Sequence, residues 1–481
     1  MIATLPTAAD LLPLLPELVL VAGAFALLML DLFLGDDRRG LTNALAIAVL
    51  AVVAWMAFAG TGGQGTVLGG MFVRDTMADV LKAVACVVSA LSLVYAWPFL
   101  RERGLYKGEV AVLVLFATAG MMLLISAGSL VMVYLGLELL ALCSYALVAI
   151  DRDSPLASEA AMKYFVLGSL ASGLLLYGMS LLYGATGTLD LATLHGAIAA
   201  SGERTLLLMG AVFLVAGIAF KFGAAPFHMW LPDTYHGAPT AITVFIGSAP
   251  KLAAFAMAFR LLDAGVGPLA PEWRLLVAAL AVASLAVGNL IALAQSNLKR
   301  MLAYSTISHV GFVFMGIAAA DAAGYAAAMF YAISYAIMAT ASFGAIVVLA
   351  RKGYEADGID DFRGLAARSP WLAGMMLCAM MSLAGIPPFL GFWAKLAVLR
   401  AAIGGDLLWL AIVGIVFAVI GCFYYLRVCK AMYFDPAPEG VPSPRPGDRV
   451  LRTVFGVNAL ALLGLGFAWN PIMAWCQAAF A

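Results

Sequence analysis

Residues 205–226 read TLLLMGAVFLVAGIAFKFGAAP, an apolar run that contains one charged residue, Lys221, and ends at Pro226. The apolar part is long enough to cross about 30 Å of hydrocarbon as a helix. Lipid offers the backbone no water to bond, so a run of this kind is helical. Proline removes a backbone donor and interrupts a helix. The stretch therefore predicts a broken membrane helix with a lysine beside the break.

Similar apolar runs recur along the whole chain of 481 residues. Hydrophobic residues make up 64% and charged residues 11%, and the mean hydropathy is +1.02. A soluble domain has about 25% charged residues, so most of this surface faces lipid. The runs lack the alternation of barrel strands. We expect an all-α polytopic membrane protein of about 14 spans, near residues 11–33, 41–60, 77–98, 109–126, 129–150, 160–183, 205–225, 240–262, 273–294, 300–319, 323–350, 370–401, 406–431 and 451–474. The first run lacks a basic segment before it, which favours a retained span over a cleaved signal.

A second proline break follows the first by five spans. Residues 384–389 read AGIPPF within the twelfth span, and Lys395 comes shortly after. Paired broken helices suggest two five-helix repeats, and an odd repeat length makes the two units antiparallel. The expected division is an N-terminal three-helix segment (1–108), repeats at 109–265 (spans 4–8) and 266–435 (spans 9–13), and a C-terminal helix (436–481).

Lysine and arginine are unevenly distributed over the loops. One set of alternate loops carries seventeen of them and the other set five. Because cytoplasmic loops are enriched in these residues, the first set is expected in the cytoplasm. With an even number of spans, both termini then lie in the periplasm, and the protein in a bacterial inner membrane. The formal net charge is zero, so nothing points to nucleic acid.

Among the charged residues inside apolar spans we single out four: Glu138, Lys221, Lys251 and Lys395. Each costs at least about 2.5–3.5 kcal/mol at the bilayer centre, so each needs a reason. Burial disfavours a lysine cation, and a nearby carboxylate favours it. A lysine held between these influences can change protonation when its partner moves, as a proton relay requires. We expect Glu138 to be the partner of Lys221.

A fixed ion pair that fastens helices is the structural alternative, but the spans supply too few carboxylates for one per lysine. His309 is a candidate relay member, with a neutral histidine bonded to a helix carbonyl as its alternative. His228, after the seventh span, could carry protons or cap a helix.

The other polar features have simpler interpretations. Gly60-Thr-Gly-Gly-Gln-Gly65 matches GxGxxG but follows a membrane helix instead of a strand, so a dinucleotide site is rejected. No P-loop, CxxC, HExxH or haem-attachment motif is present, so neither a redox centre nor a nucleotide is expected on this chain. We expect Lys82, with Asp75 and Asp79, to snorkel to the interface. Lys163, Glu159 and Asp233 are expected to cap helices and anchor them at the interface, with a proton entrance as the alternative. His195 and His236 are expected to be solvated in loops, and the six cysteines to be buried free thiols.

The segment KFGAAPFHMWLPDTYHGAPT (221–240) resembles the hallmark of the proton-translocating antiporter-like family. That family includes three large membrane subunits of respiratory complex I and subunits of multi-protein cation/proton antiporters. Residues 298–309 (LKRMLAYSTISH) and 136–139 (GLEL) match two further family segments. The resemblance covers nearly the whole chain.

Within the family, the pattern is most similar to the N-type subunits of complex I. Residues 158–165 (SEAAMKYF) look like the N-type sixth helix, Lys395 stands where M-type subunits have glutamate, and the long lateral helix of L-type subunits is missing. The resemblance implies that Glu138 and Lys221 form the channel's charge pair. By the same resemblance, Lys251 is the central lysine of the channel with His309 near it, and Lys395 takes the terminal position, which faces the neighbouring subunit. It also implies antiporter-like M-type and small K-, J- and A-type subunits as partners, with FMN, iron–sulfur clusters and quinone on partner subunits and no cofactor here.

Two rival functions remain open at this point. One is a subunit of a sodium/proton antiporter without redox coupling. The other is a scaffold whose lysines only fix assembly. Direct quinone binding is a weaker possibility, since no dedicated site stands out.

Overall fold

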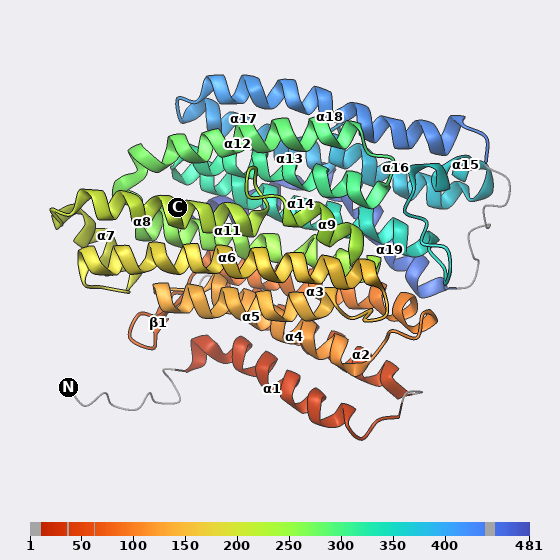
Figure 1. Cartoon of the computed structure of the whole chain (residues 1–481), viewed down its shortest axis with the longest axis horizontal. Helices are drawn as coiled ribbons and strands as arrows, with labels where there is room; N and C mark the ends of the chain where they lie inside the picture. Colours follow the sequence, from red (N-terminus) through yellow and green to blue (C-terminus); the bar gives the residue numbers. More distant parts are fainter. Residues whose placement is uncertain (1–10, 36–37, 62, 438–447) are drawn as a thin grey trace.

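The computed structural model describes residues 11–35, 38–61, 63–437 and 448–481. Gly62 of the glycine-rich motif and Arg445 of the basic loops lie outside these ranges. The described part is almost wholly helical, and its long helices lie side by side along one direction, with α1 at one lateral edge and α18 at the other (Figure 1). This confirms the all-α fold class.

The helices of the first half are α1 (Leu15–Asp31, after a 3-10 turn at Leu12–Leu14), α2 (Arg39–Ala59), α3 (Thr76–Glu102), α4 (Gly108–Ile125), α5 (Leu130–Val148), α6 (Pro155–Thr186), α7 (Leu191–Ala200), α8 (Arg204–Phe222), α9 (Trp230–Gly237), α10 (Thr240–Ile246) and α11 (Ala249–Phe259), which continues as a π-helix (Arg260–Gly265). Those of the second half are α12 (Ala270–Leu293), α13 (Leu298–Ala319), α14 (Ala322–Leu349), α15 (Leu365–Arg368), α16 (Pro370–Ala384), α17 (Leu390–Gly404), α18 (Leu408–Phe434), α19 (Arg449–Phe467) and α20 (Trp469–Ala478).

Thirteen stretches of the described chain are helical, long and apolar enough to cross a membrane. The expected span at 370–401 is absent from these thirteen because it consists of two shorter helices, α16 and α17. Thirteen spans and this interrupted pair account for the 14 expected. The inverted relation of the two five-helix units and the four-part division of the chain stay predictions.

Short elements between the spans were not predicted. The strands β1 (Gly65–Val67) and β2 (Phe72–Arg74) form an antiparallel hairpin between α2 and α3. Isolated bridges join Phe72 to Ala127 and Ser129 to Asp190, so the hairpin, the α4–α5 turn and the start of α7 meet at one end of the bundle. These segments are too short or too polar to give a span signal.

Several helices start where a side chain accepts a hydrogen bond from a free backbone N–H. Ser154 caps α6 by accepting from Ala157 N, and Pro155 occupies the first turn, where its missing N–H costs nothing. Asp75, Ser129 and Asp321 cap α3, α5 and α14 in the same way.

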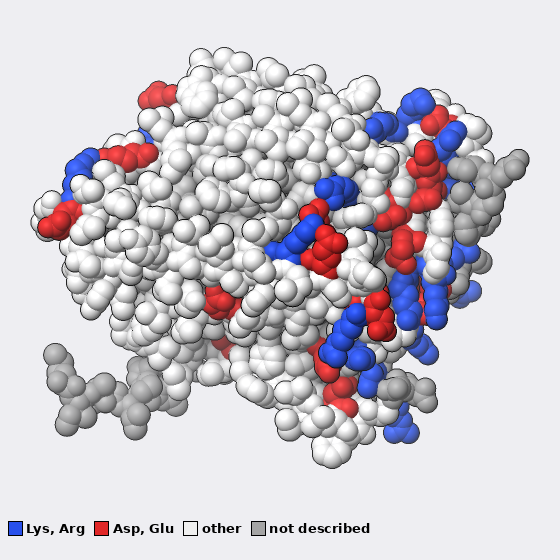
Figure 2. Space-filling model, in the orientation of Figure 1, with Lys and Arg blue, Asp and Glu red and all other residues white. Residues whose placement is uncertain are grey.

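The centre of the molecule is formed by α10, α11, α13 and α14. The apolar window of α13 is buried over its whole length, whereas only a third of the windows of α1, α6 and α18 is buried. Glycines allow close helix contact: a Cβ on Gly136 of α5 would lie 2.6 Å from Leu124 N of α4, and one on Gly288 of α12 would lie 2.5 Å from Ser308 N of α13. Charged side chains gather at one end of the helices, with few at the other and a largely uncharged band between (Figure 2).

Candidate functional site

At the first broken segment, the C-terminal end of α8 accepts a hydrogen bond from a lysine of another helix. α8 stops at Phe222, where Gly223 takes a left-handed conformation (φ +78°) that ends the helix. Lys221 lies buried in the last turn of α8. Lys251 Nζ, from α11, donates a hydrogen bond of 2.7 Å to Phe222 O. The free carbonyl end of α8 therefore faces a buried lysine.

The second broken segment has the same arrangement. α16 stops at Ala384, and Gly385 (φ +80°) ends it. Lys395 Nζ, from α17, donates to Leu383 O at 3.0 Å and to Ala384 O at 2.8 Å. The C-terminus of a helix carries free carbonyls and a partial negative charge, so it stabilises an ammonium group without a carboxylate.

Lys251 and Lys395 have no ion pair within 4.0 Å in the described part of the chain. The fixed ion pair considered as their structural alternative is therefore wrong for these two lysines. Lys251 Nζ instead faces the rings of Trp230 (5.5 Å) and Tyr235 (6.0 Å), and Lys395 Nζ faces Phe312 (5.4 Å).

Glu138 and Lys221 do not touch. Among the described residues Lys221 has no ion pair, yet Glu138 is the carboxylate whose charge acts on it. Glu138 Oε1 on α5 is buried without a hydrogen-bond partner. A cavity of about 20 Å³, room for about one water molecule, lies beside Lys221 and is lined by Leu137, Tyr145 and Tyr164. The direct pairing expected from the sequence is therefore absent among the described contacts of these two residues.

His309 is the centre of a buried hydroxyl cluster. Its Nδ1 lies 2.7 Å from Tyr331 Oη, and its Nε2 lies 3.1 Å from Tyr425 Oη. Tyr425 also bonds Ser305 Oγ, 2.5 Å away. The alternative of a histidine bonded to a helix carbonyl is therefore wrong, because both ring nitrogens meet phenols.

Sequence reasoning missed these tyrosines. Tyr331 and Tyr335 are four residues apart on α14, which places both on the face that packs against His309. Tyr335 Oη donates to Thr306 Oγ1 at 2.7 Å. Two features of the sequence could have predicted this cluster: the four-residue spacing of Tyr331 and Tyr335, and the Ser and Thr residues that precede His309.

The polar residues near the α6–α9 contact form ion pairs. Asp233 on α9 binds Lys163 of α6 at 2.8 Å and Arg300 of α13 at 2.9 Å, and Lys163 also binds Glu159 at 2.8 Å. Helix capping by these residues is wrong for α6, which Ser154 caps.

Lys299 and three histidines also differ from expectation. Lys299, counted among the loop cations, is buried in α13 and donates to Ala238 O at 2.8 Å. His195 and His236 lie in helices α7 and α9 instead of loops, with His195 exposed and His236 partly buried. His228 lies partly buried between α8 and α9, and no side chain caps α9.

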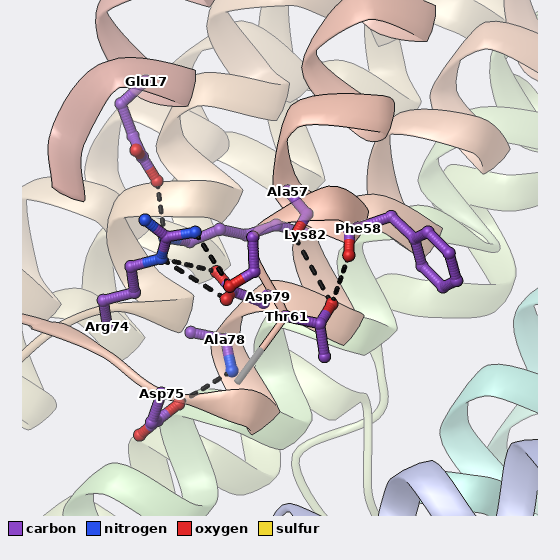
Figure 3. Close-up of polar contacts among 10 residues, drawn as sticks. Glu17, Ala57, Phe58, Thr61, Arg74, Asp75, Ala78, Asp79 and Lys82 are labelled. Atoms are coloured by element: carbon purple, nitrogen blue, oxygen red, sulfur yellow. Dashed lines mark hydrogen bonds and ion pairs between the residues drawn. The ribbon is translucent and has the colours of Figure 1, made fainter. Parts of the chain in front are cut away.

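Lys82 does not snorkel. Its side chain is 2% exposed, and Nζ lies 2.6 Å from Glu17 Oε1 of α1 (Figure 3). Nζ also lies 4.6 Å from the centre of the Phe72 ring. Arg74 binds Asp79 beside it at 3.2 Å. The expectation failed because α1 and the hairpin cover this part of α3.

All six cysteines are free, as expected; four are buried, and Cys378 and Cys422 are partly exposed.

Comparison with known proteins gives consistent matches. The chain is 70% identical over 475 residues to NADH-quinone oxidoreductase subunit N of Xanthomonas euvesicatoria pv. vesicatoria (strain 85-10), covering 99% of this chain and 97% of that protein. It is 50% identical to the protein of the same name from Thioalkalivibrio sulfidiphilus (strain HL-EbGR7), covering 95% of each.

Solved structures share the fold. A chain of respiratory complex I from Thermus thermophilus, with bound aureothin, matches with a TM-score of 0.82 and 30% identity over 96% of this chain and 100% of that chain. A chain of the Mrp complex from Dietzia sp. DQ12-45-1b matches with a TM-score of 0.86 at 24% identity, over 99% and 97% of the two chains, which shows the fold alone.

A family model described as "NADH:quinone oxidoreductase/Mrp antiporter, TM" matches residues 127–421, which include both broken segments, Glu138, His309 and all three lysines. With the near-complete match to close relatives, this places the protein: the chain belongs to the NADH:quinone oxidoreductase/Mrp antiporter family of membrane subunits.

Proposed function

We propose that this chain is a membrane-arm subunit of a proton-translocating NADH:quinone oxidoreductase, and that it moves protons through its buried lysines. One observation carries the proposal: Lys251 and Lys395 are buried, neither forms an ion pair with a carboxylate of the described residues, and each donates to the carbonyl end of an interrupted helix. An ammonium group held by carbonyls can lose its proton without stranding a buried carboxylate.

The path runs Glu138, Lys221, Lys251, His309, Lys395. Lys221 directly precedes Phe222, whose carbonyl accepts from Lys251. His309 and Lys395 lie on α13 and α17, which pack against each other. Between Lys251 and His309 stand the phenols of Tyr235 and Tyr335, with Tyr335 centred 5.1 Å from the His309 ring. His228, at the first break, serves proton entry.

Driving force comes from charge changes in partner subunits. Such a change acts on Glu138, whose gap to Lys221 is not fixed by an ion pair, and alters the proton affinity of Lys221. Moving one charge against 100 mV requires about 2.3 kcal/mol. Electrostatic coupling across a low-dielectric interior is large enough to supply energies of this order.

Electron transfer belongs to partner subunits in this proposal. FMN, iron–sulfur clusters and quinone are carried there, and this chain contributes no redox group. Its neighbours are the antiporter-like M-type and the small K-, J- and A-type membrane subunits. The chain lies in the bacterial inner membrane with both termini in the periplasm.

The test is Lys251→Ala, and separately Lys395→Ala, in the complete complex, with Lys352→Ala as the matched control because Lys352 is exposed outside the spans. We expect NADH-driven proton uptake by inside-out vesicles to fall at least about tenfold in the first two variants and to stay unchanged in the control. A blue-native gel stained for NADH dehydrogenase activity reports assembly. Full pumping by assembled Lys251→Ala complex contradicts the role; loss of the complex itself supports the scaffold function.

A second candidate is a sodium/proton antiporter subunit, favoured by the matching family model, whose description also names the Mrp antiporter. Vesicles given no NADH distinguish the two. Sodium-dependent proton exchange there supports the antiporter, and its absence supports the respiratory subunit.

A further inference from the structure

A seam between α3 and α14 opens into a cavity at its charged end. The cavity has a volume of about 400 Å³ and lies between the last turns of α3, the last turn of α14 and the first turn of α19. Trp97 and Arg101 of α3 and Arg452 of α19 line it. Tryptophan at the end of a membrane helix is typical of the headgroup region.

In the described part of the chain, neither Arg101 nor Arg452 forms an ion pair with a carboxylate within 4.0 Å. Arg101 lies 5.5 Å from the Trp97 ring and Arg452 5.2 Å from the Trp371 ring. Two carboxylates also line the cavity, but both are engaged. Asp448 accepts from Leu451 N at 3.0 Å, and Glu102 accepts from Lys352 N at 3.3 Å. Neither carboxylate bonds Arg101 or Arg452, so both guanidinium groups keep N–H donors for a phosphate, although the four charged side chains of the lining have no net charge.

A second, apolar cavity, the apolar groove, lies deeper along the same two helices. It has a volume of about 380 Å³ and is lined almost wholly by carbon, with Val87 and Leu91 of α3, Ile337 of α14 and Trp475 of α20. Leu91 and Arg101 are ten residues apart on α3, about 15 Å along the helix. That is half of the roughly 30 Å of hydrocarbon in a bilayer.

The two cavities are separated by a close helix contact. Between them Tyr95 of α3 packs against Gly344 of α14. An acyl chain from the first cavity would therefore follow the outer face of α3, where Val94 is partly exposed.

We propose that this seam binds an anionic phospholipid, with its phosphate at Arg101 and Arg452 and an acyl chain along α3 into the apolar groove. Arginine pairs with phosphate oxygens through charge-assisted hydrogen bonds. Basic pockets between membrane helices recognise anionic headgroups in this way. A free phosphate leaves the groove empty, and an apolar protein helix leaves the arginines without a partner, so a phospholipid fits both cavities together.

The test uses photo-crosslinking in membranes that contain the complete complex. The probe is phosphatidylglycerol with a diazirine near the end of one acyl chain, and adducts are located by peptide mass spectrometry. We expect adducts on α3 and α14 at the groove. The double variant Arg101→Gln/Arg452→Gln is expected to reduce them about tenfold or more at sub-saturating probe. Arg152→Gln, an exposed arginine outside the seam, is the matched control and is expected to leave them unchanged.

A second variant tests the groove without touching the arginines. Val87 is half exposed, so Val87→Trp fills the groove with little strain and is expected to move adducts away from Leu91. NADH dehydrogenase activity of the complex confirms assembly of each variant. Equal labelling by a phosphatidylcholine probe, adduct yields unaffected by the arginine substitutions, or crosslinks of α3 to another protein chain would each overturn the proposal.

Discussion

The Glu17–Lys82 pair shows what a buried ion pair costs when one residue changes. Both side chains are almost fully buried, Glu17 at 5% and Lys82 at 2% exposure. Removing one partner leaves a buried charge alone, which costs about 3–5 kcal/mol, whereas replacing both is far less costly. We expect Glu17→Gln to lower the thermal stability of the purified complex, and Glu17→Gln/Lys82→Met to recover most of the loss. A double variant as unstable as the sum of the two single variants contradicts this coupling.

Tyr425 supplies one of the two hydroxyls on His309. Tyr425→Phe removes the partner of His309 Nε2 and of Ser305 Oγ while keeping the ring. We expect NADH-driven pumping to fall about tenfold, since a positioned proton-transfer group contributes at least that much. Tyr433→Phe, at the exposed end of the same helix α18, is the control. Equal pumping in both variants would remove Tyr425 from the path.

At the scale of elements, the break between α16 and α17 depends on Gly385. Its φ of +80° is unfavourable for other residues, and a Cβ there would lie 2.7 Å from Lys395 Cδ. Gly385→Ala is expected to displace Lys395 and reduce pumping. Gly374→Ala, within α16 and with nothing near the added Cβ, is expected to stabilise the helix by up to about 1 kcal/mol and leave pumping intact. Similar pumping in both variants contradicts the role of this geometry.

The same elements show how far the sequence predicted the structure. Apolar length located the spans, because each must cross a fixed thickness of hydrocarbon. The hairpin β1–β2 and the short helices α7 and α20 were missed, since each is too short to give the signal of a membrane span. Lys82 was wrongly assigned to the interface. It is buried because α1 and the hairpin pack over it, and that packing cannot be predicted from the sequence around Lys82.

At the scale of the whole molecule, the uneven distribution of Lys and Arg predicts orientation. Single cysteines introduced by Ala481→Cys and by Arg152→Cys test it with a membrane-impermeant maleimide, with the parent chain as background. We expect Ala481→Cys to be labelled in spheroplasts and Arg152→Cys only in inside-out vesicles. The reverse pattern would invert the proposed topology.

The sequence by itself determined the membrane fold, the number of spans and the identities of the intramembrane charges. It could do so because lipid penalises each unpaired backbone group and each charge locally, wherever the rest of the chain lies. Only the tertiary structure decided what each charge meets. Lys251 reaches Phe222 O across 29 residues, His309 meets Tyr425 across 116, and Lys395 turns to helix carbonyls instead of a carboxylate. Such contacts depend on how each helix is rotated against its neighbours, and that rotation follows from close packing of the whole bundle.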